Sequence, residues 1–453
     1  NPGLKGDLYQ RIFVVSAYGG ITNQLLEHKK TGQSGVYALF ANAEKSGSWQ
    51  EAFAELRSTM LNINSEFFSE DSELKIANNF ISGRLDDAER VLLDLQRLCE
   101  HGHFSLADHL QTVREMLASL GEIHSAYNTA QLLRADGVNA RFVDLSGWTG
   151  DKHYSLDEQI TRAFDEVDLA TELPITTGYS HCEGGLMASF DRGYSEMTFS
   201  RVAVITGAKE AIIHKEFHLS TADPRLVGES EAVPIGRTNY DVADQLANLG
   251  MEAIHPKAAK GLRQDNIRLR VKNTFEPEHN GTLITSDYTS SKPCVEIIAG
   301  RKGVLAIELF DQDMVGSVSD YSAKFLEQIE RFNAQLITMD VNANTITHYL
   351  DTNLKTVKRI QAALEDVLPG SEVNVRKVAV VSAIGSNMKV PGILAQTTTA
   401  LAEVNVSVLA MHQSMRQVDM QFIIDEGDYD SAVKSLHKRL VEVHEHGAAI
   451  CAS

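Results

Sequence analysis

An arginine and a glutamate four positions apart could fix a cation and an anion side by side. Arg192 and Glu196 have this spacing in the stretch ASFDRGYSE, residues 188–196. Arg192 can hold a carboxylate through two parallel hydrogen bonds, because its guanidinium presents a planar fork of N–H donors. Glu196 can bind an amino group or orient a lysine. A plain surface ion pair is the commoner role of such a pair and contributes little, so this stretch needs support from elsewhere in the chain.

A second candidate is the segment SAYGGITN, residues 16–23, which follows a short apolar run. Gly19 and Gly20 would let backbone N–H groups approach an anion, and the start of a helix would add positive potential. Ser16 and Thr22 add hydroxyl donors. The sequence has no GxxxxGK[ST], which excludes a Walker-type site, and no complete GxGxxG, which disfavours a dinucleotide site. The segment predicts a phosphate-binding turn, with a purely structural turn as the alternative.

Two later segments place a cation after a turn. In STADPR, residues 220–225, the Asp-Pro pair forms a turn and Arg225 follows it, which suits a nucleotide phosphate at the edge of a sheet. HPK, residues 255–257, supplies Lys257 after another turn. A solvated loop is the alternative for STADPR, and a generic cation is the alternative for Lys257. HCE at 181–183 is a weak metal candidate, because consecutive residues do not face the same way, and we expect no metal site.

The elements that must position these residues alternate between strand and helix. Residues 12–17 and 267–275 are strand-like, and residues 36–135 are mostly helical in pattern. The Gly-Glu pair at 121–122 lies inside the helical pattern, where a solvated glutamate at a kink is the plain interpretation. Alternating strands and helices predict an α/β fold with a largely parallel sheet covered on both faces.

Two segments of similar design follow. Each reads strand–helix–strand–strand–helix, the first from a strand at 304–310 to a helix at 354–368 and the second from a strand at 378–384 to a helix at 429–440. This pattern predicts an internal repeat of two small α+β modules.

Length and charge restrict the class of protein. A chain of 453 residues is too long for one ordinary core, so we expect two or three domains. The net charge of -19 argues against nucleic-acid and membrane-surface binding, which need a basic face. No apolar run reaches the roughly 18 residues that span a bilayer, and the first residues lack the pattern of a signal peptide. The four cysteines are far apart and form no CxxC pair, which favours a reducing cytoplasm.

Several segments, in this order, resemble the aspartate kinases of the amino acid kinase family: VVSAYGGITN, the Gly-Glu pair at 121–122, RGYSE, STADPR, NLGMEAIHPK and VKNTFEPEHNGTLI. The two C-terminal modules resemble the ACT regulatory domains of these enzymes. The resemblance implies a three-layer α/β/α sandwich with a mostly parallel sheet, followed by two ferredoxin-like ACT modules. It implies these boundaries: a kinase domain at 1–290 with a helical lobe at 40–120, and modules at 293–370 and 371–453, whose tail completes the first module.

The resemblance also implies a reaction. ATP, carrying Mg²⁺ on its phosphates, would transfer its γ-phosphoryl group to the β-carboxylate of L-aspartate and give 4-phospho-L-aspartate. This chemistry needs positioning and cations near the moving charge more than covalent help. The implied substrate-binding residues are Glu122 for the ammonium group, Arg192 for the α-carboxylate, and Ser16, Thr22, Ser189 and Ser195 along the pocket. The implied catalytic pair is Arg192 and Glu196, and the implied nucleotide contacts are Gly19, Gly20, Lys215, Glu216, Asp223, Arg225 and Lys257.

The sequence departs from the family pattern in three places. The family has a Lys-Phe-Gly-Gly-Thr-like strand end, whose lysine stabilises the transferring phosphate, and this sequence has no such strand end. We expect that the segment belongs before residue 1 and is missing from this sequence. Arg-Gly-Gly-Ser-Asp is Arg-Gly-Tyr-Ser-Glu here, so Glu196 keeps the charge but moves it by one methylene. Trp-Thr-Asp-Val is His-Lys-Glu-Phe at 214–217. These changes resemble the divergent aspartate kinases found with ectoine biosynthesis genes, which implies a role in osmolyte supply.

The ACT modules imply lysine or threonine as an effector and a homodimer or higher oligomer through their sheets. The first module keeps the loop at 311–317 but has Asn-Ala at 342–343, where the family has Ser-Glu. The second keeps the Gln-led pattern at 413–422. The candidate effector residues are Met314, Gly316, Asn342, Met388 and Gln413.

Two classes of function stay open. The first is the enzyme, favoured by the retained Glu122, Arg192, Ser195 and Arg225. The second is a catalytically impaired sensor that binds aspartate, lysine or threonine and regulates a partner, favoured by the missing lysine and the altered Arg-Gly-Gly-Ser-Asp motif. A kinase for another amino acid, such as glutamate, is disfavoured by the ACT repeat.

Overall fold

The computed structural model describes residues 8–28, 31–42, 47–148, 154–190, 193–251, 253–442 and 449–450. The chain forms two compact units. One is Asn1–Lys209 with Lys257–Asp265, and the other is Glu210–Pro256 with Asn266–Ser453. The second unit joins part of the expected kinase domain to the C-terminal modules, so the compact units follow a different division from the expected domain boundaries, which stay predictions.

The first unit contains a parallel sheet of three short strands. Its order is β1 (Phe13–Val15), β3 (Leu173–Thr177) and β2 (Ala140–Val143). Val15 is paired with Thr177, so β1 and β3 end together. Residues that follow parallel strands meet at one edge of the sheet, which is where α/β proteins place their ligands.

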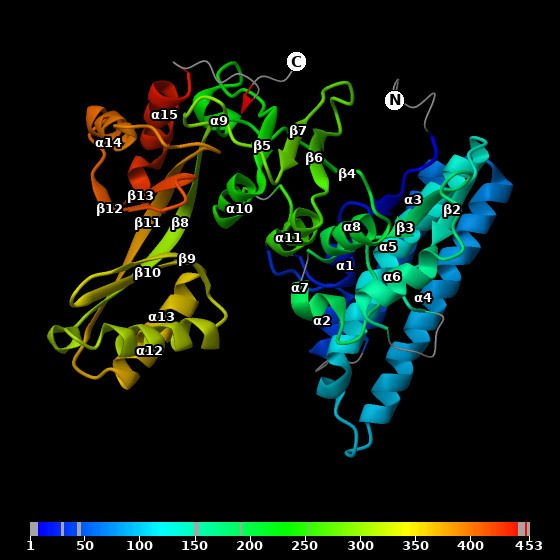
Figure 1. Ribbon diagram of the computed structural model, residues 1–453. Coiled ribbons are helices and arrows are strands. Elements are labelled where there is room, and N and C mark those ends of the chain that lie inside the picture. Colours follow the sequence, from blue (N-terminus) through cyan, green and yellow to red (C-terminus); the bar gives the residue numbers. More distant parts are fainter. Residues whose placement is uncertain are drawn as a thin grey trace. The chain divides into compact units, whose positions relative to one another are not determined.

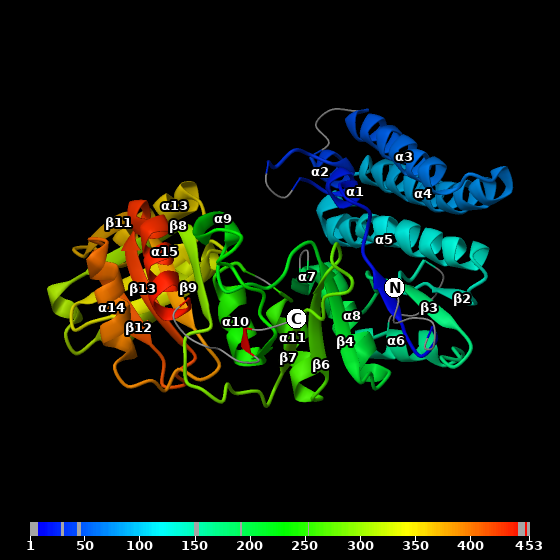
Figure 2. The same ribbon diagram turned by 90° about the horizontal axis from the view of Figure 1, so that it is seen from above.

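Three long helices cover this sheet on one side. They are α3 (Ser48–Phe67), α4 (Asp71–Cys99) and α5 (Leu110–Ala135), which lie side by side (Figure 1). Helix α5 lies between the strands and the α3–α4 pair (Figure 2). It is therefore buried on opposite faces, including the whole stretch from Leu117 to Ala126. A helix in such a layer has no polar face, unlike the amphipathic helices at a protein surface.

The remaining helices of the first unit are short. They are α1 (Ile21–Leu25), α2 (Val36–Ala41), η2 (Leu106–His109), α6 (Leu156–Phe164), α7 (Leu186–Phe190), α8 (Tyr194–Ile205) and α11 (Pro256–Gln264). Helix α6 was missed by the sequence patterns, although its capping box is a readable signal. The Ser155 side chain accepts from the Glu158 amide, and the Glu158 carboxylate accepts from the Ser155 amide.

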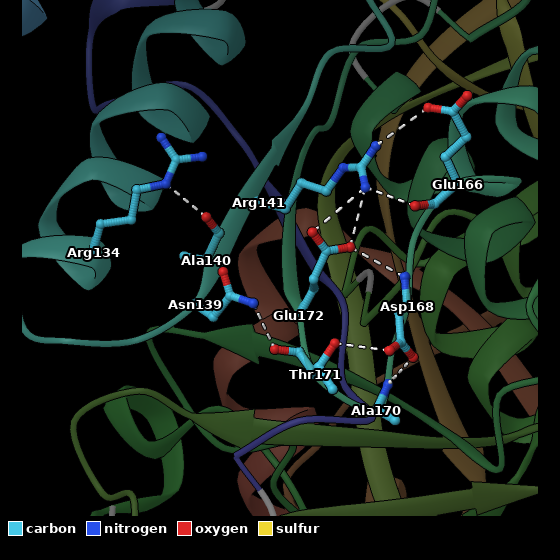
Figure 3. Close-up of polar contacts among 9 residues, drawn as sticks. All are labelled: Arg134, Asn139, Ala140, Arg141, Glu166, Asp168, Ala170, Thr171 and Glu172. Atoms are coloured by element: carbon cyan, nitrogen blue, oxygen red, sulfur yellow. Dashed lines mark hydrogen bonds and ion pairs between the residues drawn. The ribbon is translucent and has the colours of Figure 1, made fainter.

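A polar network holds the amino ends of β2 and β3 (Figure 3). Arg141 donates to the carbonyl of Glu166 at 2.7 Å and pairs with the carboxylate of Glu172 at 3.1 Å. Arg134, near the end of α5, donates to the carbonyl of Ala140 at 2.7 Å. These contacts fix the strands relative to α5 at the sheet edge opposite the carboxyl ends.

The second unit begins with a four-stranded sheet. Its order is β4 (Glu210–Lys215), β6 (Arg268–Asn273), β7 (Thr282–Thr285) and β5 (Arg237–Asn239). The pairs β4–β6 and β5–β7 are parallel and β6–β7 is antiparallel. The short helices α9 (Pro224–Val227) and α10 (Tyr240–Asn248) belong to the same unit. Together with the first sheet, these pairings confirm the prediction of a mostly parallel α/β fold.

The two C-terminal modules have the predicted strand–helix–strand–strand–helix order. The first contains β8 (Ile297–Phe310), η3 (Gln312–Met314), α12 (Val318–Arg331), β9 (Gln335–Val341), β10 (Thr345–Asp351) and α13 (Leu354–Val367). The second contains β11 (Glu372–Ile384), α14 (Ile393–Glu403), β12 (Val408–Gln413), β13 (Asp419–Asp425), η4 (Glu426–Asp428) and α15 (Tyr429–Leu440).

Both modules share one six-stranded sheet. Strands β8 and β11 pair antiparallel in its centre, from Ile297 opposite Ile384 to Phe310 opposite Glu372 (Figure 1). The order is β12-β13-β11-β8-β10-β9, so β12 and β9 are its outer strands. No helix in the described part of the chain is long and apolar enough to cross a membrane.

The β8–β11 pairing yields a stability test at Gly300. A Cβ there would lie 2.6 Å from the carbonyl oxygen of Val380 and 2.7 Å from the Tyr429 ring. We expect Gly300→Val to lower the free energy of unfolding by about 1–3 kcal/mol, because overpacking strains the backbone. Gly83→Ala is the matched control: it lies in α4 with open space around it and should stabilise by about 1 kcal/mol. Urea unfolding measures the free energy of unfolding of both variants. An unchanged value for Gly300→Val would contradict the close packing at Gly300.

Candidate functional site

The candidate site of the first unit is built around the carboxyl group of Glu122. This residue lies in α5 and is 1% exposed. The hydroxyl of Ser195, in the first turn of α8, donates to its Oε1 at 2.5 Å. The backbone amides of Ala17 and Tyr179, which follow β1 and β3, are oriented toward the carboxyl. The side chain therefore sits over the carboxyl ends of two parallel strands, and the interpretation as a solvated glutamate is wrong.

Two glycines make this close approach possible. At Gly178, which directly follows β3, a Cβ would lie 2.8 Å from Glu122 Oε2 and 2.9 Å from Ser195 Cβ. At Gly121 a Cβ would lie 2.8 Å from the Cβ of Ala17. Both positions exclude larger side chains, so the Gly-Glu pair is a packing requirement of α5 against the turn after β1. It is not a kink.

Burial determines the charge of this group. It raises the pKa of Glu122 to about 8, because desolvation of the carboxylate outweighs the hydrogen bonds from Ser195 and the two amides. Among the described residues, none donates a hydrogen bond of ordinary geometry to Oε2. A cation at Oε2 would restore the ionised form, so the site is suited to a ligand that brings a positive charge.

The predicted phosphate-binding turn lies directly beside this carboxyl. Gly20 is the N-cap of α1 with φ of 84°, a conformation that glycine adopts without strain. A Cβ at Gly19 or Gly20 would meet no atom within 4 Å, so the backbone here is open to its surroundings. Ser16 is exposed and its carbonyl accepts from Ser125 Oγ of α5 at 2.7 Å, while Thr22 is half-buried. The structure thus brings the turn and Glu122 to one edge of the sheet.

A second carboxylate of α5 organises the chain that leads to Ser195. Glu115 Oε2 accepts from the Tyr179 hydroxyl at 2.7 Å. Its Oε1 accepts from the backbone amides of Met187 and Ala188 at 2.8 and 3.2 Å. Glu115 therefore ties both the end of β3 and the start of α7 to α5. Sequence analysis missed it, although its spacing of seven residues before Glu122 places it on the same helix face.

Two predicted substrate contacts lie outside the described residues: the side chain of Ser189, whose backbone belongs to α7, and the whole of Arg192. Their roles stay predictions. Glu196 lies half-buried in the first turn of α8, where an acidic side chain interacts favourably with the helix dipole. Lys257, in α11 of the same unit, places its Nζ 4.9 Å from the centre of the Phe190 ring.

The weak metal candidate has no support in its surroundings. Burial, together with the charge of Glu115, raises the pKa of the Cys182 thiol to about 11, so it stays protonated. No group of three or more His, Cys, Asp or Glu in the described part of the chain is arranged to hold a metal ion.

The predicted nucleotide contacts of the second unit lie at the end of β4 and at the start of α9. Asp223 caps α9: its Oδ1 accepts from the Arg225 amide at 2.9 Å, and its Oδ2 accepts from the Arg225 guanidinium at 2.7 Å. The hydrogen bonds from Arg225 lower the pKa of Asp223. The Arg225 side chain is 88% exposed, so its guanidinium is held at one end and open at the other. Lys215 ends β4 and Glu216 is exposed beside it.

The candidate effector residues divide into two groups. Met314 and Met388 occupy corresponding loops of the two modules, and both are buried in the hydrophobic cores. Gly316, Asn342 and Gln413 are exposed. The exposed group can contact a ligand at the surface, whereas the two methionines shape the loops from below.

Comparisons with known proteins agree with these features. A model of the amino acid kinase family matches residues 4–273, and a model of the ACT domain matches residues 381–440. Aspartate kinase Ask_Ect of Stutzerimonas stutzeri (strain A1501) is 55% identical over 446 residues, covering 98% of this chain and 94% of that protein.

Two solved structures are similar over nearly the whole chain. An aspartate kinase from Clostridium acetobutylicum has a TM-score of 0.72 at 19% identity and covers 96% of this chain and 94% of that one. E. coli aspartokinase III in complex with aspartate and ADP has a TM-score of 0.68 at 22% identity and covers 95% and 93%. These likenesses show the fold.

The burial of Glu122 predicts a pH-dependent stability. Its pKa rises from the ordinary value of 4.5 to about 8 on folding. The contribution of the protonated carboxyl to the free energy of unfolding is therefore fully present below pH 4.5 and is lost as the pH rises through 8. Glu122→Gln keeps an acceptor for Ser195 but cannot ionise. We expect its stability relative to the natural protein to increase with pH across that window, by at most about 1.4 kcal/mol per pH unit.

Urea unfolding at pH values spanning the window measures this difference. Glu158→Gln is the matched control, because Glu158 is fully exposed and its hydrogen bonds with Ser155 lower its pKa. Its difference from the natural protein should not increase with pH in the same way. A Glu122→Gln difference that stayed constant from the lowest to the highest pH would contradict the buried neutral carboxyl.

Proposed function

Because the chain belongs to the amino acid kinase family, we propose that it transfers the γ-phosphoryl group of ATP to the β-carboxylate of L-aspartate. The product is 4-phospho-L-aspartate. The observation that carries the proposal is the buried carboxyl of Glu122 at the carboxyl edge of the first sheet. The relative called an aspartate kinase at 55% identity supports the same activity.

Glu122 is suited to bind the substrate ammonium group. Its Oε1 is engaged by Ser195, and its Oε2 has no donor of ordinary geometry among the described residues. An ammonium group supplies N–H donors and a positive charge together, so it satisfies Oε2 and favours the ionised carboxylate. Near neutral pH, aspartate binding then displaces the proton that burial places on this carboxyl.

The turn after β1 is suited to the phosphoryl groups. The backbone at Gly19 and Gly20 is open, and Ser16 and Thr22 stand at the two ends of the turn. Amide and hydroxyl donors stabilise negative charge on a transferring phosphoryl group without any covalent step. Because this turn adjoins Glu122, the ammonium and phosphoryl subsites lie at one edge of the sheet.

Arg192 is the proposed clamp for the α-carboxylate of aspartate. It follows α7, whose first amides are held by Glu115, and precedes α8, which carries Ser195. Arg192 and Glu196 are the proposed catalytic pair, and Ser189 is proposed to line the pocket.

The proposed nucleotide contacts are Lys215, Glu216, Asp223, Arg225 and Lys257, with Gly19 and Gly20 at the phosphates. The exposed guanidinium of Arg225, oriented by Asp223, fits a polyphosphate. Mg²⁺ bound through the ATP phosphates would neutralise charge as the phosphoryl group moves. On the resemblance described above, we also propose a role in osmolyte supply and a homodimer formed through the ACT modules.

The activity is tested by trapping the acyl phosphate with hydroxylamine in the presence of Mg-ATP and L-aspartate. Arg192→Ala should raise the KM for aspartate by roughly 10²-fold, because truncating one partner of a buried charge pair costs about 2–5 kcal/mol. Arg201→Ala is the matched control. Arg201, in α8, pairs with Asp157 of α6 at 2.6 Å and belongs to no proposed substrate contact, so its loss should leave both KM values nearly unchanged.

The same experiment separates the two classes of function. Hydroxamate formation by the natural protein, with a raised KM for aspartate in Arg192→Ala and an unchanged one in Arg201→Ala, supports the kinase. A natural protein that binds aspartate by calorimetry but forms no hydroxamate is a sensor, and the kinase proposal fails.

We also propose that inhibition by lysine or threonine is weak. Asn342 and Ala343 lie exposed after β9, at the position where the family has a Ser-Glu pair, so the carboxylate that would meet an effector ammonium is absent there. Adding lysine, threonine or both to the hydroxamate assay should reduce the rate little. Strong inhibition by either amino acid at low concentration would contradict this expectation.

A further inference from the structure

The STADPR loop, which carries Asp223 and Arg225, is fastened at Thr221. The Thr221 amide donates to the carbonyl of Val233 at 2.9 Å, and its own carbonyl accepts from the amide of Ile298 in β8 at 2.8 Å. Its Oγ1 accepts from the Val233 amide at 3.1 Å and lies 2.9 Å from Nε2 of His437. Thr221 is fully buried. The interpretation of this segment as a solvated loop is therefore wrong for its first half.

The partner of Thr221 comes from the second ACT module. His437 lies in the last turn of α15, is fully buried, and places its Nδ1 2.9 Å from Oε1 of Glu442. An ionised carboxylate can only accept, so Nδ1 carries the proton in this pair. In this tautomer Nε2 accepts from the Thr221 hydroxyl, whose oxygen accepts from the Val233 amide. The Val233 amide, the Thr221 hydroxyl, the His437 ring and the Glu442 carboxylate thus form one continuous chain of donors and acceptors.

We propose that His437 is a positioning residue for nucleotide binding. By holding Thr221, it fixes the start of the segment that ends in the Asp223–Arg225 pair two to four residues later. The inference deepens the proposed function and rests on it, because it takes Asp223 and Arg225 as contacts of ATP. His437 touches no reacting group, and its effect passes through Thr221.

The apolar residues beside Thr221 hold the loop in place but do not set its orientation, so the hydrogen bond between Thr221 and His437 matters. Leu219 packs in the hydrophobic core of the second unit and Ala222 is 1% exposed, so the loop backbone is already held on two sides. Apolar contacts resist removal from the core but restrict orientation only weakly. The directional bonds at Thr221 set the orientation of the turn, and His437 is the side chain that completes them.

Two substitutions separate the two bonds of His437. Glutamine is long enough to place its amide where Nε2 lies, so His437→Gln keeps the contact with Thr221. Asparagine places its amide where Nδ1 lies, so His437→Asn keeps only the contact with Glu442. We expect His437→Asn to raise the KM for ATP roughly tenfold, because it leaves the Thr221 hydroxyl unmatched, with the KM for aspartate within about twofold. His437→Gln should stay close to the natural protein in both.

Ser435→Ala supplies the matched control on the same helix. Ser435 Oγ donates to the carbonyl of Ala400 in α14 at 2.6 Å, within its own module. Its loss should lower the melting temperature without changing either KM. A purely structural role for His437 predicts that His437→Asn lowers the melting temperature without changing either KM, or that His437→Gln raises the KM for ATP as much as His437→Asn does. Either result overturns the proposal.

Calorimetric titration with ADP keeps this test independent of turnover. If the natural protein binds ADP but forms no hydroxamate, the kinase proposal fails, while weaker ADP binding by His437→Asn alone still supports the positioning role. If hydroxamate forms normally and the two His437 variants bind ADP equally, the positioning role fails and the kinase stands. A natural protein that neither binds ADP nor turns over overturns both. Thermal unfolding of each variant shows that the comparison is between folded proteins.

Discussion

The first unit depends on the cost of burying the Glu122 carboxyl. Removing a carboxylate from water is expensive, and here it raises the pKa to about 8. A group of this kind is kept only where the surroundings are arranged for it: Gly121 and Gly178 leave the space, and the Ser195 hydroxyl supplies the donor. The layered position of α5, the ends of β1 and β3 and the start of α8 all meet at this one side chain.

Local patterns in the sequence predicted the elements better than their contacts. The alternation of strands and helices and the repeated modules are confirmed, because hydrophobic period is a local property. The burial of Glu122 could not be predicted, because α5 is covered on opposite faces and has no polar stripe that would place a residue inside or outside. Glu115 was missed for the same reason. The capping box formed by Ser155 and Glu158 could have predicted the start of α6 from the sequence, but this signal was missed.

Contacts between distant segments were beyond the sequence patterns. The modules were predicted as a repeat, but nothing local indicates that β8 of one pairs with β11 of the other along their whole length. The contact between Thr221 and His437 joins residues 216 positions apart. Such pairs are set by tertiary packing, which also merges the STADPR loop with both modules into one compact unit.

The central pairing of β8 with β11 has a consequence for how the chain is made. Until β11 has been synthesised, the edge of β8 that pairs with it has no hydrogen-bonding partner. Unpaired strand edges can pair with other chains. Exchange of β11 between two nascent copies would satisfy the same hydrogen bonds, which is the usual route to domain swapping. Each module therefore depends on the other to complete the hydrogen bonding of its own long strand.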